Sequence, residues 1–246
     1  MKINKKFFFS NLTTIFYALI IAIVIRSLIF QPFYIPSSSM EPTLLVGDRL
    51  FVSKYTYGYS KHSFPFSPNI SNDRFFFKDP KRGEVIVFKT PTDNRTDYIK
   101  RLIGLPGDEI MFIDGDLYLN NNQILKTKKN IKNLKIFCGE DIIDVIAYDE
   151  KLPNGNSYTT VYKKEGSFKN SDKYIVPKNH YFFLGDNRDC SKDSRYLNSV
   201  GYVNKLNLVG KARVIFFSTD KNKGYIFQIW KWFEIIRWNR FFNIIN

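Results

Sequence analysis

The sequence is poor in cysteine and histidine. Its 246 residues include two cysteines, Cys138 and Cys190, and two histidines, His62 and His180. Two cysteines exclude a disulfide-rich scaffold and a four-cysteine zinc site, and the isolated histidines form no spacing such as H-E-x-x-H. We therefore expect no histidine-based metal site, no metal and no cofactor.

Acidic residues are also scarce relative to basic ones. Lys and Arg number 37 against 23 Asp and Glu, which gives a formal net charge of +14. Such an excess predicts an anionic neighbour, either nucleic acid or the acidic face of a membrane. Hydrophobic residues make up 44% and aromatic residues 17% of the chain, which is too apolar for a disordered protein. The length predicts one or two domains.

Long hydrophobic runs are confined to the N-terminus. Residues 12–30 are apolar except for a short polar interruption at Arg26 and Ser27. The unbroken run 15–25 has the length of a signal-peptide core, whereas a helix over 12–30 would measure about 28 Å and could span a bilayer. No small-x-small cleavage site follows, and Arg26 near one end can extend to the interface, so a retained anchor is favoured. The lysines within residues 1–11 predict a cytoplasmic N-terminus, with the remaining chain outside.

Residues 220–246 predict an amphipathic helical tail. Apolar residues recur there at helical intervals with basic residues between them. Two interpretations stay open: a membrane-interface helix with aromatic rings among the lipid headgroups, or an ordinary helix packed on the core. The apolar series is Ile229, Trp232, Phe233, Ile236 and Phe241, and the interleaved charged residues are Lys231, Glu234, Arg237 and Arg240.

The chain between these ends has the pattern of β-strands. Short segments rich in β-branched and aromatic residues alternate with Gly, Pro, Asn and Asp. Asp114-Gly115 is typical of a two-residue hairpin turn. We expect a mainly β, antiparallel fold, with a catalytic domain of residues 31–107 and 181–219 and a smaller inserted β sub-domain of residues 108–180. The strand segments are 50–55, 84–89, 97–103, 109–113, 116–120, 180–185 and 211–217.

Three short stretches have compositions that packing alone does not explain. Residues 36–44 carry three consecutive serines between prolines, and residues 185–195 are dense in charges and hydroxyls. In the third stretch, 98–108, the two-residue period of a strand puts a basic residue, Lys100 or its neighbour Arg101, into an apolar row. A buried lysine loses its proton more easily, and a neutral amine is a competent general base. Taken singly, a linker, a solvated strand lysine and a surface turn remain alternatives.

Together these stretches, in this order behind an anchor, resemble the type I signal peptidases, which are membrane-bound serine proteases with a Ser–Lys dyad. The matching segments are P-S-S-S-M-x-P-T-L at 36–44, G-D-R-L-F-V-S-K-Y-x-Y-G at 47–58, R-G-E-V-I-V-F-K at 82–89, D-Y-I-K-R-x-I-G-L-P-G-D at 97–108 and G-D-N-R-D-x-S-x-D-S-R at 185–195.

The resemblance implies a role for each matching residue. Ser39 would be the nucleophile and Lys100 its general base, while the Ser39 N–H and the Ser37 hydroxyl would form the oxyanion hole. Ser191 would hydrogen-bond and orient the lysine amine, and Asp193, Arg195 and Arg101 would form a salt-bridged support. Substrate side chains one and three positions before the cut would be small, in shallow pockets lined by Phe33, Ile35, Met40, Leu44, Val87, Tyr98 and Ile99.

The implied activity is removal of signal peptides from exported preproteins after a small-x-small motif, without a cofactor. The implied partners are preprotein signal peptides, the phospholipid bilayer and, indirectly, the translocation machinery, with no nucleic acid. The enzyme would be a single-pass protein of the bacterial inner membrane with its catalytic domain on the periplasmic side. An extended substrate could add as a β-strand near residues 32–36 and 85–88.

Two positions depart from the family pattern, and two other functions remain open. Ser38 stands where the family commonly has glycine. Cys190 stands where relatives usually have another residue; its pairing with Cys138 is left open, with a buried free thiol as the default. A self-cleaving repressor-type Ser–Lys protease would need a DNA-binding helical domain where this chain has an anchor. A non-enzymatic, membrane-tethered β-module that binds anionic partners is the other alternative.

Overall fold

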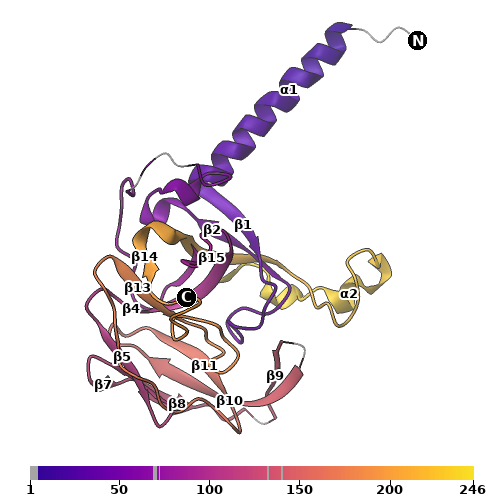
Figure 1. The fold of residues 1–246 in the computed structure, drawn as a ribbon. Helices are drawn as coiled ribbons and strands as arrows, with labels where there is room; N and C mark the ends of the chain where they lie inside the picture. The colour runs from indigo at the N-terminus through magenta and orange to yellow at the C-terminus, as the bar shows by residue number, and fades with distance from the viewer. Residues whose placement is uncertain (1–4, 69–70, 72, 132, 140) are drawn as a thin grey trace.

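A single long helix projects from a body of β-sheets (Figure 1). The structure, a computed structural model, describes residues 5–68, 71, 73–131, 133–139 and 141–246, so part of the predicted cytoplasmic segment 1–11 lies outside it. Helix α1 (Lys5–Val24) continues into a π-helical turn, η1 (Ile25–Ile29). Within it, Asn11–Ile29 is long and apolar enough to cross a membrane. Its apolar side chains are exposed along the segment, as expected for a helix whose surroundings are apolar.

The main sheet has eight strands, and every described pairing within it is antiparallel, as the alternating pattern predicted. Strand β1 forms one edge, and β16 adds to β15 near the C-terminus. The order is β1 (Phe30–Tyr34), β2 (Asp48–Ser53), β15 (Leu208–Ser218), β3 (Val85–Lys89), β4 (Asp97–Gly104), β13 (His180–Leu184) and β14 (Val203–Asn204), with β16 (Asn243–Ile244) on β15.

Two smaller sheets follow from the middle of the chain. The first has the order β12 (Tyr174–Ile175), β5 (Glu109–Ile113), β6 (Asp116–Leu119), β7 (Asn122–Gln123). The second pairs β10 (Asp141–Lys151) with β11 (Ser157–Lys163), β8 (Leu125–Lys128) and β9 (Lys135–Cys138). The hairpin predicted at Asp114-Gly115 is confirmed: both residues have positive φ, 49° and 82°, and they join β5 to β6. The domain boundaries themselves stay a prediction.

The main and smaller sheets share a hydrophobic core. Ile103 and Phe182 of the main sheet pack in one cluster with Ile110, Phe112 and Leu117 of the β5–β6 hairpin. A separate cluster lies under the serine-rich loop. Burying each of these side chains contributes about 1.5–3 kcal/mol, so the packing fixes the relative position of the sheets that carry the polar residues.

The C-terminal tail contains only a short helix. The helical segment α2 (Trp232–Ile235) is flanked by the 3₁₀ turns η5 (Ile229–Lys231) and η6 (Trp238–Arg240). A long helix does not form because two tail arginines hydrogen-bond the body: Arg237 Nη1 donates to Val46 O at 2.8 Å, and Arg240 donates to both carboxylate oxygens of Asp48.

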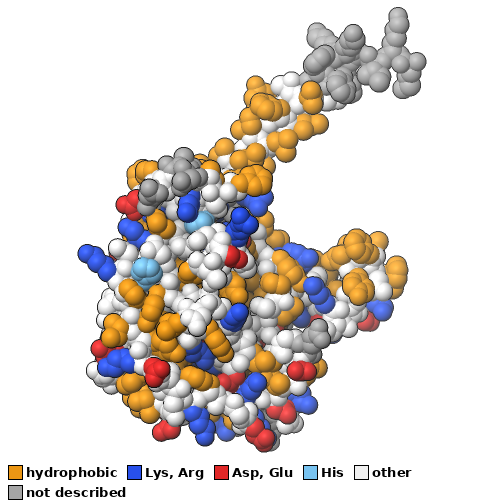
Figure 2. All heavy atoms as spheres, viewed as in Figure 1, with side chains coloured by type: hydrophobic (Ala, Val, Ile, Leu, Met, Phe, Trp, Pro, Cys, Tyr) orange, Lys and Arg blue, Asp and Glu red, His pale blue; other side chains and the backbone are white. Residues whose placement is uncertain are grey.

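The tail therefore combines features of both interpretations. Ile235, Ile236 and Ile245 are buried, whereas the aromatic side chains of Phe227, Trp230 and Phe233 are 86%, 76% and 88% exposed. These exposed residues belong to a lobe that stands out from the body around α2 (Figures 1 and 2).

Short turns complete the part of the fold near the helix. They are η2 (Tyr55–Tyr57) and η3 (Lys61–Ser63) after β2, and η4 (Lys205–Asn207) before β15. The Tyr59 hydroxyl donates to Leu28 O at 2.9 Å, and Lys54 N donates to Ile29 O at 3.0 Å. These bonds fasten the base of the long helix to the β body.

Candidate active site

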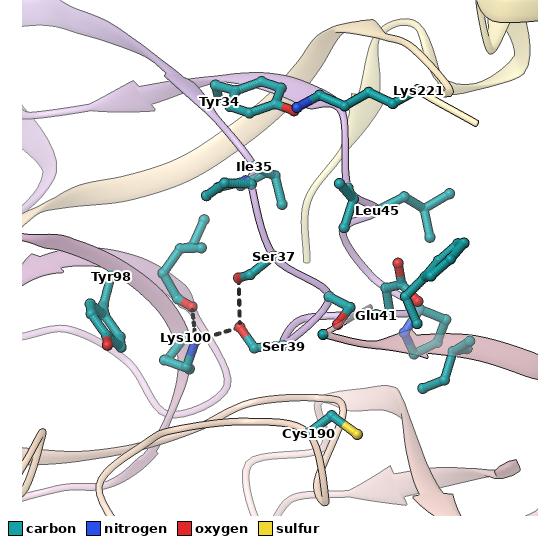
Figure 3. Close-up of a pocket in the computed structure, with 18 of the residues that line it drawn as sticks. Tyr34, Ile35, Ser37, Ser39, Glu41, Leu45, Tyr98, Lys100, Cys190 and Lys221 are labelled. Carbon is teal, nitrogen blue, oxygen red and sulfur yellow. Dashed lines mark hydrogen bonds between the residues drawn. The ribbon is translucent and has the colours of Figure 1, made fainter. Parts of the chain in front are cut away.

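A cleft of about 1130 Å³ lies between the serine-rich loop, strand β4 and strand β9 (Figure 3). Five of the seven residues expected to line substrate pockets do line it, and residues 134–137 form a further part of its wall. Met40 and Leu44 do not: they are 1% and 0% exposed and belong to the core cluster below. Their contact with substrate stays a prediction, because both side chains pack in the same cluster as Ile35 and Val87, which are equally buried and do line the cleft. The five lining residues are Phe33, Ile35, Val87, Tyr98 and Ile99.

Ser39 and Lys100 meet inside this cleft. Lys100 Nζ donates to Ser39 Oγ at 2.6 Å, although the residues are 61 positions apart in the chain. Ser39 lies in a turn closed by two backbone hydrogen bonds, Glu41 N to Ser38 O and Leu44 N to Met40 O. Lys100 is on β4, whose neighbour β3 pairs with it through Ile86. The turn and the strand therefore bring the two side chains together.

The surroundings of Lys100 favour the uncharged amine. The residue is 3% exposed, and burial lowers the pKa of its ammonium group from 10.5 to about 8, against the opposing effect of the carboxylates of Asp193 and Asp186. A pKa of about 8 leaves roughly a tenth of the amine neutral at pH 7, compared with less than a thousandth for an ordinary lysine. The amine also donates to Ile99 O at 3.0 Å, which directs it toward the cleft.

Ser37 extends this polar chain. Its hydroxyl lies 3.4 Å from Ser39 Oγ, at the exposed side of the same turn (Figure 3). Among the residues that the structure describes, no group of three or more His, Cys, Asp or Glu side chains is arranged to hold a metal ion. The groups that line the cleft include the serine hydroxyls, the Lys100 amine of lowered pKa and the buried carboxyl of Glu41, whose pKa is raised by burial.

Ser191 lies close to this turn without hydrogen-bonding the lysine. It is 4% exposed, and its hydroxyl has no hydrogen-bond partner of good geometry among the described residues. The expected bond from Ser191 to the amine is therefore not formed in this structure. A Cβ at Gly185 would lie 2.2 Å from Ser191 Oγ and 2.4 Å from Ser39 O. The glycine lets the Ser191 loop approach the serine turn directly.

The expected support consists of two separate ion pairs rather than one cluster. Arg195 binds both carboxylate oxygens of Asp193, at 2.8 and 2.9 Å, and Asp193 also accepts from Gly185 N. Arg101 instead binds both oxygens of Asp186, each at 2.8 Å, and both partners are buried. Sequence reasoning missed Asp186 as this partner.

A third buried ion pair was also missed. Arg188 donates to both oxygens of Glu150 at 2.8 and 2.7 Å, and the hydroxyls of Tyr158 and Tyr162 donate to the same carboxylate. This network joins the polar loop 185–195 to strands β10 and β11. Its signal in the sequence was the alternation Tyr158, Thr160, Tyr162, which puts three hydroxyl groups on one face of a strand.

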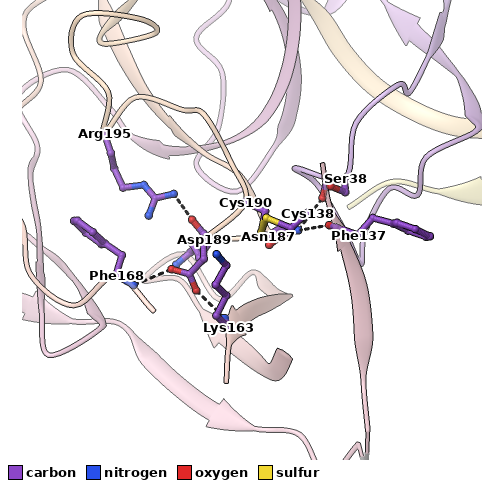
Figure 4. Close-up of a disulfide and its surroundings, with 10 residues drawn as sticks. Ser38, Phe137, Cys138, Lys163, Phe168, Asn187, Asp189, Cys190 and Arg195 are labelled. Carbon is purple, nitrogen blue, oxygen red and sulfur yellow. Dashed lines mark hydrogen bonds between the residues drawn. A yellow bond between two sulfur atoms is a disulfide. The ribbon is translucent and has the colours of Figure 1, made fainter. Parts of the chain in front are cut away.

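Cys138 and Cys190 form a disulfide, so the default expectation of a free thiol is wrong (Figure 4). The bond connects the end of β9, in one wall of the cleft, with the loop that holds Ser191. Asn187 reinforces the same junction, since its amide nitrogen donates to Ser38 O at 3.1 Å and to Phe137 O at 3.4 Å. The cysteines are 52 positions apart, and only the folded sheets bring them together.

The strand edges near the cleft differ from the expectation. Residues 86–88 of β3 are paired on both sides, with β15 and with β4, so that strand cannot accept another. Strand β1 is an edge of the main sheet, and residues 97–100 of β4 pair with β3 but not with β13. The backbone edges that remain open beside the cleft therefore belong to β1 and to the first half of β4.

A β-sheet fold with a buried serine and lysine in one cleft is that of a candidate serine hydrolase, and an apolar N-terminal helix is compatible with anchoring it in a membrane. A family model described as "Signal peptidase, peptidase S26" matches residues 8–217. The chain therefore belongs to the signal peptidase family S26, and it is a serine hydrolase of that family. The resemblance inferred from the motifs is confirmed.

Two relatives with similar sequences agree with this assignment. Signal peptidase I of Rickettsia typhi is 41% identical over an alignment of 250 positions. The alignment covers 94% of this chain and 91% of the relative. Signal peptidase I of Rickettsia bellii is 40% identical over 241 residues, covering 91% of this chain and 81% of the relative. The solved structure of a signal peptidase I from Enterococcus faecalis also matches this chain. The match covers 55% of this chain and 97% of the solved chain, with 27% identity and a TM-score of 0.32.

Proposed function

We propose that this protein is a membrane-anchored endopeptidase that removes signal peptides from exported preproteins, with Ser39 as nucleophile and Lys100 as general base. The observation that supports this most is the 2.6 Å contact between Lys100 Nζ and Ser39 Oγ in an open cleft. Serine is a weak nucleophile until a base takes its proton, and the lowered pKa of Lys100 makes its amine such a base.

The proposed reaction has two steps. Neutral Lys100 accepts the hydroxyl proton as Ser39 Oγ attacks the carbonyl carbon of the scissile bond, and the lysine then gives that proton to the departing amine. Water next attacks the carbonyl carbon of the resulting ester while Lys100 takes its proton. Lys100 then returns that proton to Ser39 Oγ as the ester bond breaks, which regenerates the serine and releases the signal peptide as a carboxylic acid. The backbone N–H of Ser39 and the hydroxyl of Ser37 would donate to the oxyanion in both steps. One such donor is typically worth about 3–4 kcal/mol.

We assign positioning roles to the polar residues around the pair. The ion pair between Asp193 and Arg195 would hold the loop 185–195 in shape behind Lys100. The ion pair between Arg101 and Asp186 would fix that loop to strand β4. Ser191 would act on the amine only after a rotation of its hydroxyl away from the Asp193 carboxylate, with which it interacts. Its position within the same packed junction supports this role.

The cleft supports selection of small side chains. Phe33, Ile35, Val87, Tyr98 and Ile99 would line shallow pockets for the residues one and three positions before the cut. An extended substrate would pair with the open edge of β4 at residues 97–100, opposite β1, so that main-chain hydrogen bonds set the register and the pockets set the small-x-small preference.

Anchoring would bring the enzyme and its substrate into one bilayer. Asn11–Ile29 would span the inner membrane with residues 1–11 in the cytoplasm and the β body on the periplasmic side, near the translocation machinery that delivers preproteins. Confining both reactants to a membrane raises their effective concentration. The exposed aromatic lobe around α2 would touch the lipid surface beside the helix.

The test is cleavage of a preprotein by the detergent-solubilised full chain, followed by N-terminal sequencing of the product. We expect a cut after a small-x-small motif, and near-complete loss of cleavage for Ser39→Ala, Lys100→Ala and Lys100→Arg, because a guanidinium cannot act as the base. Lys128→Arg, at an exposed site on β8, is the matched control and should cleave normally. Normal turnover by Lys100→Arg would contradict the proposed base.

A further inference from the structure

A second cavity, of about 600 Å³, lies beside the base of the long helix, and the proposed reaction does not use it. Arg26, in η1, and Gln31, in β1, form part of its wall. Most of the remaining wall comes from residues 61–67 after β2 and from residues 89–97, which connect β3 to β4, and Val209 of β15 completes it. The hydrogen bond from Tyr59 to Leu28 O holds the first of these segments against the helix.

The charges around this cavity are unbalanced. Four cationic residues line it, Arg26, Lys61, Lys89 and Arg95, against two carboxylates. Both carboxylates already have partners. Asp97 forms an ion pair with Lys89 at 2.9 Å, and Asp93 accepts hydrogen bonds from two threonine hydroxyls. Among the described residues, Arg26, Lys61 and Arg95 enter no ion pair. The cavity is therefore suited to an anion.

A buried histidine adds a directed polar atom. His62 is 4% exposed and lines the cavity; its Nδ1 lies 3.0 Å from Ser67 Oγ, while its Nε2 has no partner. Burial, together with the nearby cations led by Lys61, lowers the pKa of the imidazole to about 4, so the ring is neutral at pH 7. In the tautomer in which Ser67 donates to Nδ1, Nε2 carries the hydrogen, and a rotation of the ring toward the cavity would let this buried atom donate to an acceptor oxygen. In that tautomer Nε2 is a buried donor without an acceptor, and an oxygen of a bound anion would supply one.

Position and neighbouring side chains narrow the choice of anion. The cavity adjoins the end of Asn11–Ile29, so in a membrane-anchored enzyme it would lie at the level of the lipid headgroups. Figure 2 shows Lys and Arg side chains just below the point where the helix leaves the body. Phe66, in the wall of the cavity, is fully exposed and could enter the lipid layer.

We propose that this cavity binds the phosphodiester of an anionic phospholipid headgroup, with His62 Nε2, Lys61, Arg95 and Arg26 around the phosphate oxygens. A zwitterionic headgroup fits less well, because its ammonium group would meet the same excess of cations. This inference rests on the proposed membrane anchoring. Since Asp97 lines both this cavity and the catalytic cleft, the bound lipid would lie beside the entrance for substrate.

The test is lipid binding to the delipidated full chain in detergent, measured by native mass spectrometry. The lipid probes are dioleoylphosphatidylglycerol and dioleoylphosphatidylcholine. Inorganic phosphate and glycerol 3-phosphate are the soluble probes, and they test whether the cavity binds a phosphate group without a lipid. We expect one phosphatidylglycerol to be retained in preference to phosphatidylcholine, and the soluble phosphates to compete weakly. Equal retention of both lipids, or soluble phosphates that displace phosphatidylglycerol at equal concentration, would overturn the lipid assignment.

Variants locate the binding. Lys61→Gln combined with Arg95→Gln should weaken phosphatidylglycerol binding roughly fivefold for each cation removed, from the usual gain of a basic residue near an anionic surface. Lys128→Gln combined with Lys151→Gln, exposed on β8 and β10, removes the same charge elsewhere and should leave binding unchanged. Equal binding by the two double variants would refute the site.

A cleavage assay separates this inference from the proposed function. Lys61 and Arg95 lie outside the proposed catalytic groups, so their double variant should still cut a preprotein in detergent. Normal cleavage with unchanged lipid binding would refute the lipid site alone. Absence of preprotein cleavage by the wild-type chain would refute the proposed function.

Discussion

Replacing Lys100 with methionine should abolish cleavage and yet stabilise the folded protein at neutral pH. The buried ammonium group has a pKa of about 8 instead of 10.5, so folding makes its protonated form less favourable. Each pKa unit corresponds to 1.36 kcal/mol, and the difference amounts to about 3 kcal/mol of lost stability below pH 8. Methionine has a similar length and shape without the charge.

The net gain is smaller than the full penalty. Lys100→Met also removes the hydrogen bonds to Ser39 Oγ and Ile99 O, each worth about 1 kcal/mol. We therefore expect the free energy of unfolding at pH 7 to rise by about 1–2 kcal/mol. Between pH 8 and 10.5 the folded amine is neutral while the unfolded chain still holds its proton, so the stability of the wild-type protein rises with pH and the advantage of methionine disappears.

The assay is guanidinium unfolding of the detergent-solubilised full chain, followed by far-ultraviolet circular dichroism across this pH range. Lys128→Met, at an exposed position, is the control and should show no pH-dependent difference from the wild type. A Lys100→Met protein that is less stable than the wild type at pH 7, with a difference independent of pH, would refute the argument that the amine is desolvated.

Three further outcomes follow from the site. The acid limb of kcat/KM should rise about tenfold per pH unit and level off near the Lys100 pKa of about 8, and a plateau reached only near 10.5 would contradict the buried base. Cys138→Ser opens a loop of 52 residues and should lower the free energy of unfolding by about 4 kcal/mol in the chain-entropy account; an unchanged denaturation midpoint would contradict it. Gly185→Ala should cost about 1–3 kcal/mol and most of the cleavage activity, because its Cβ would overlap Ser191 Oγ and Ser39 O, and full activity would show that the loop can move away.

Local patterns in the sequence predicted the elements well. The apolar run over 12–30 predicted a helix because its composition is continuous, and α1 and η1 occupy it. Alternation predicted the strands, and Asp114-Gly115 predicted a tight hairpin because both positions need positive φ. These properties depend on neighbouring residues only, so the sequence contains them directly.

The tail shows where a local pattern was insufficient. Its apolar residues do recur at helical intervals. Hydrogen bonds from Arg237 and Arg240 to residues of the β body nevertheless outweigh the helix propensity of the tail. Such contacts come from parts of the chain about 190 positions away, and no window of sequence contains them.

The sequence by itself determined which chemical groups are available: a hydroxyl-rich turn, a lysine in an apolar strand and a loop dense in charges. Strand alternation could not decide which of Lys100 and Arg101 is buried. In the structure both faces of β4 are packed, so both residues are buried: Lys100 contacts Ser39, and Arg101 contacts Asp186. The partners of Cys138 and Arg188, and the inward direction of Met40, likewise depended on how the sheets pack. Pairing across tens of residues is a property of the assembled sheets, because the free energy that selects each partner comes from burial and from contacts that exist only after the strands have come together.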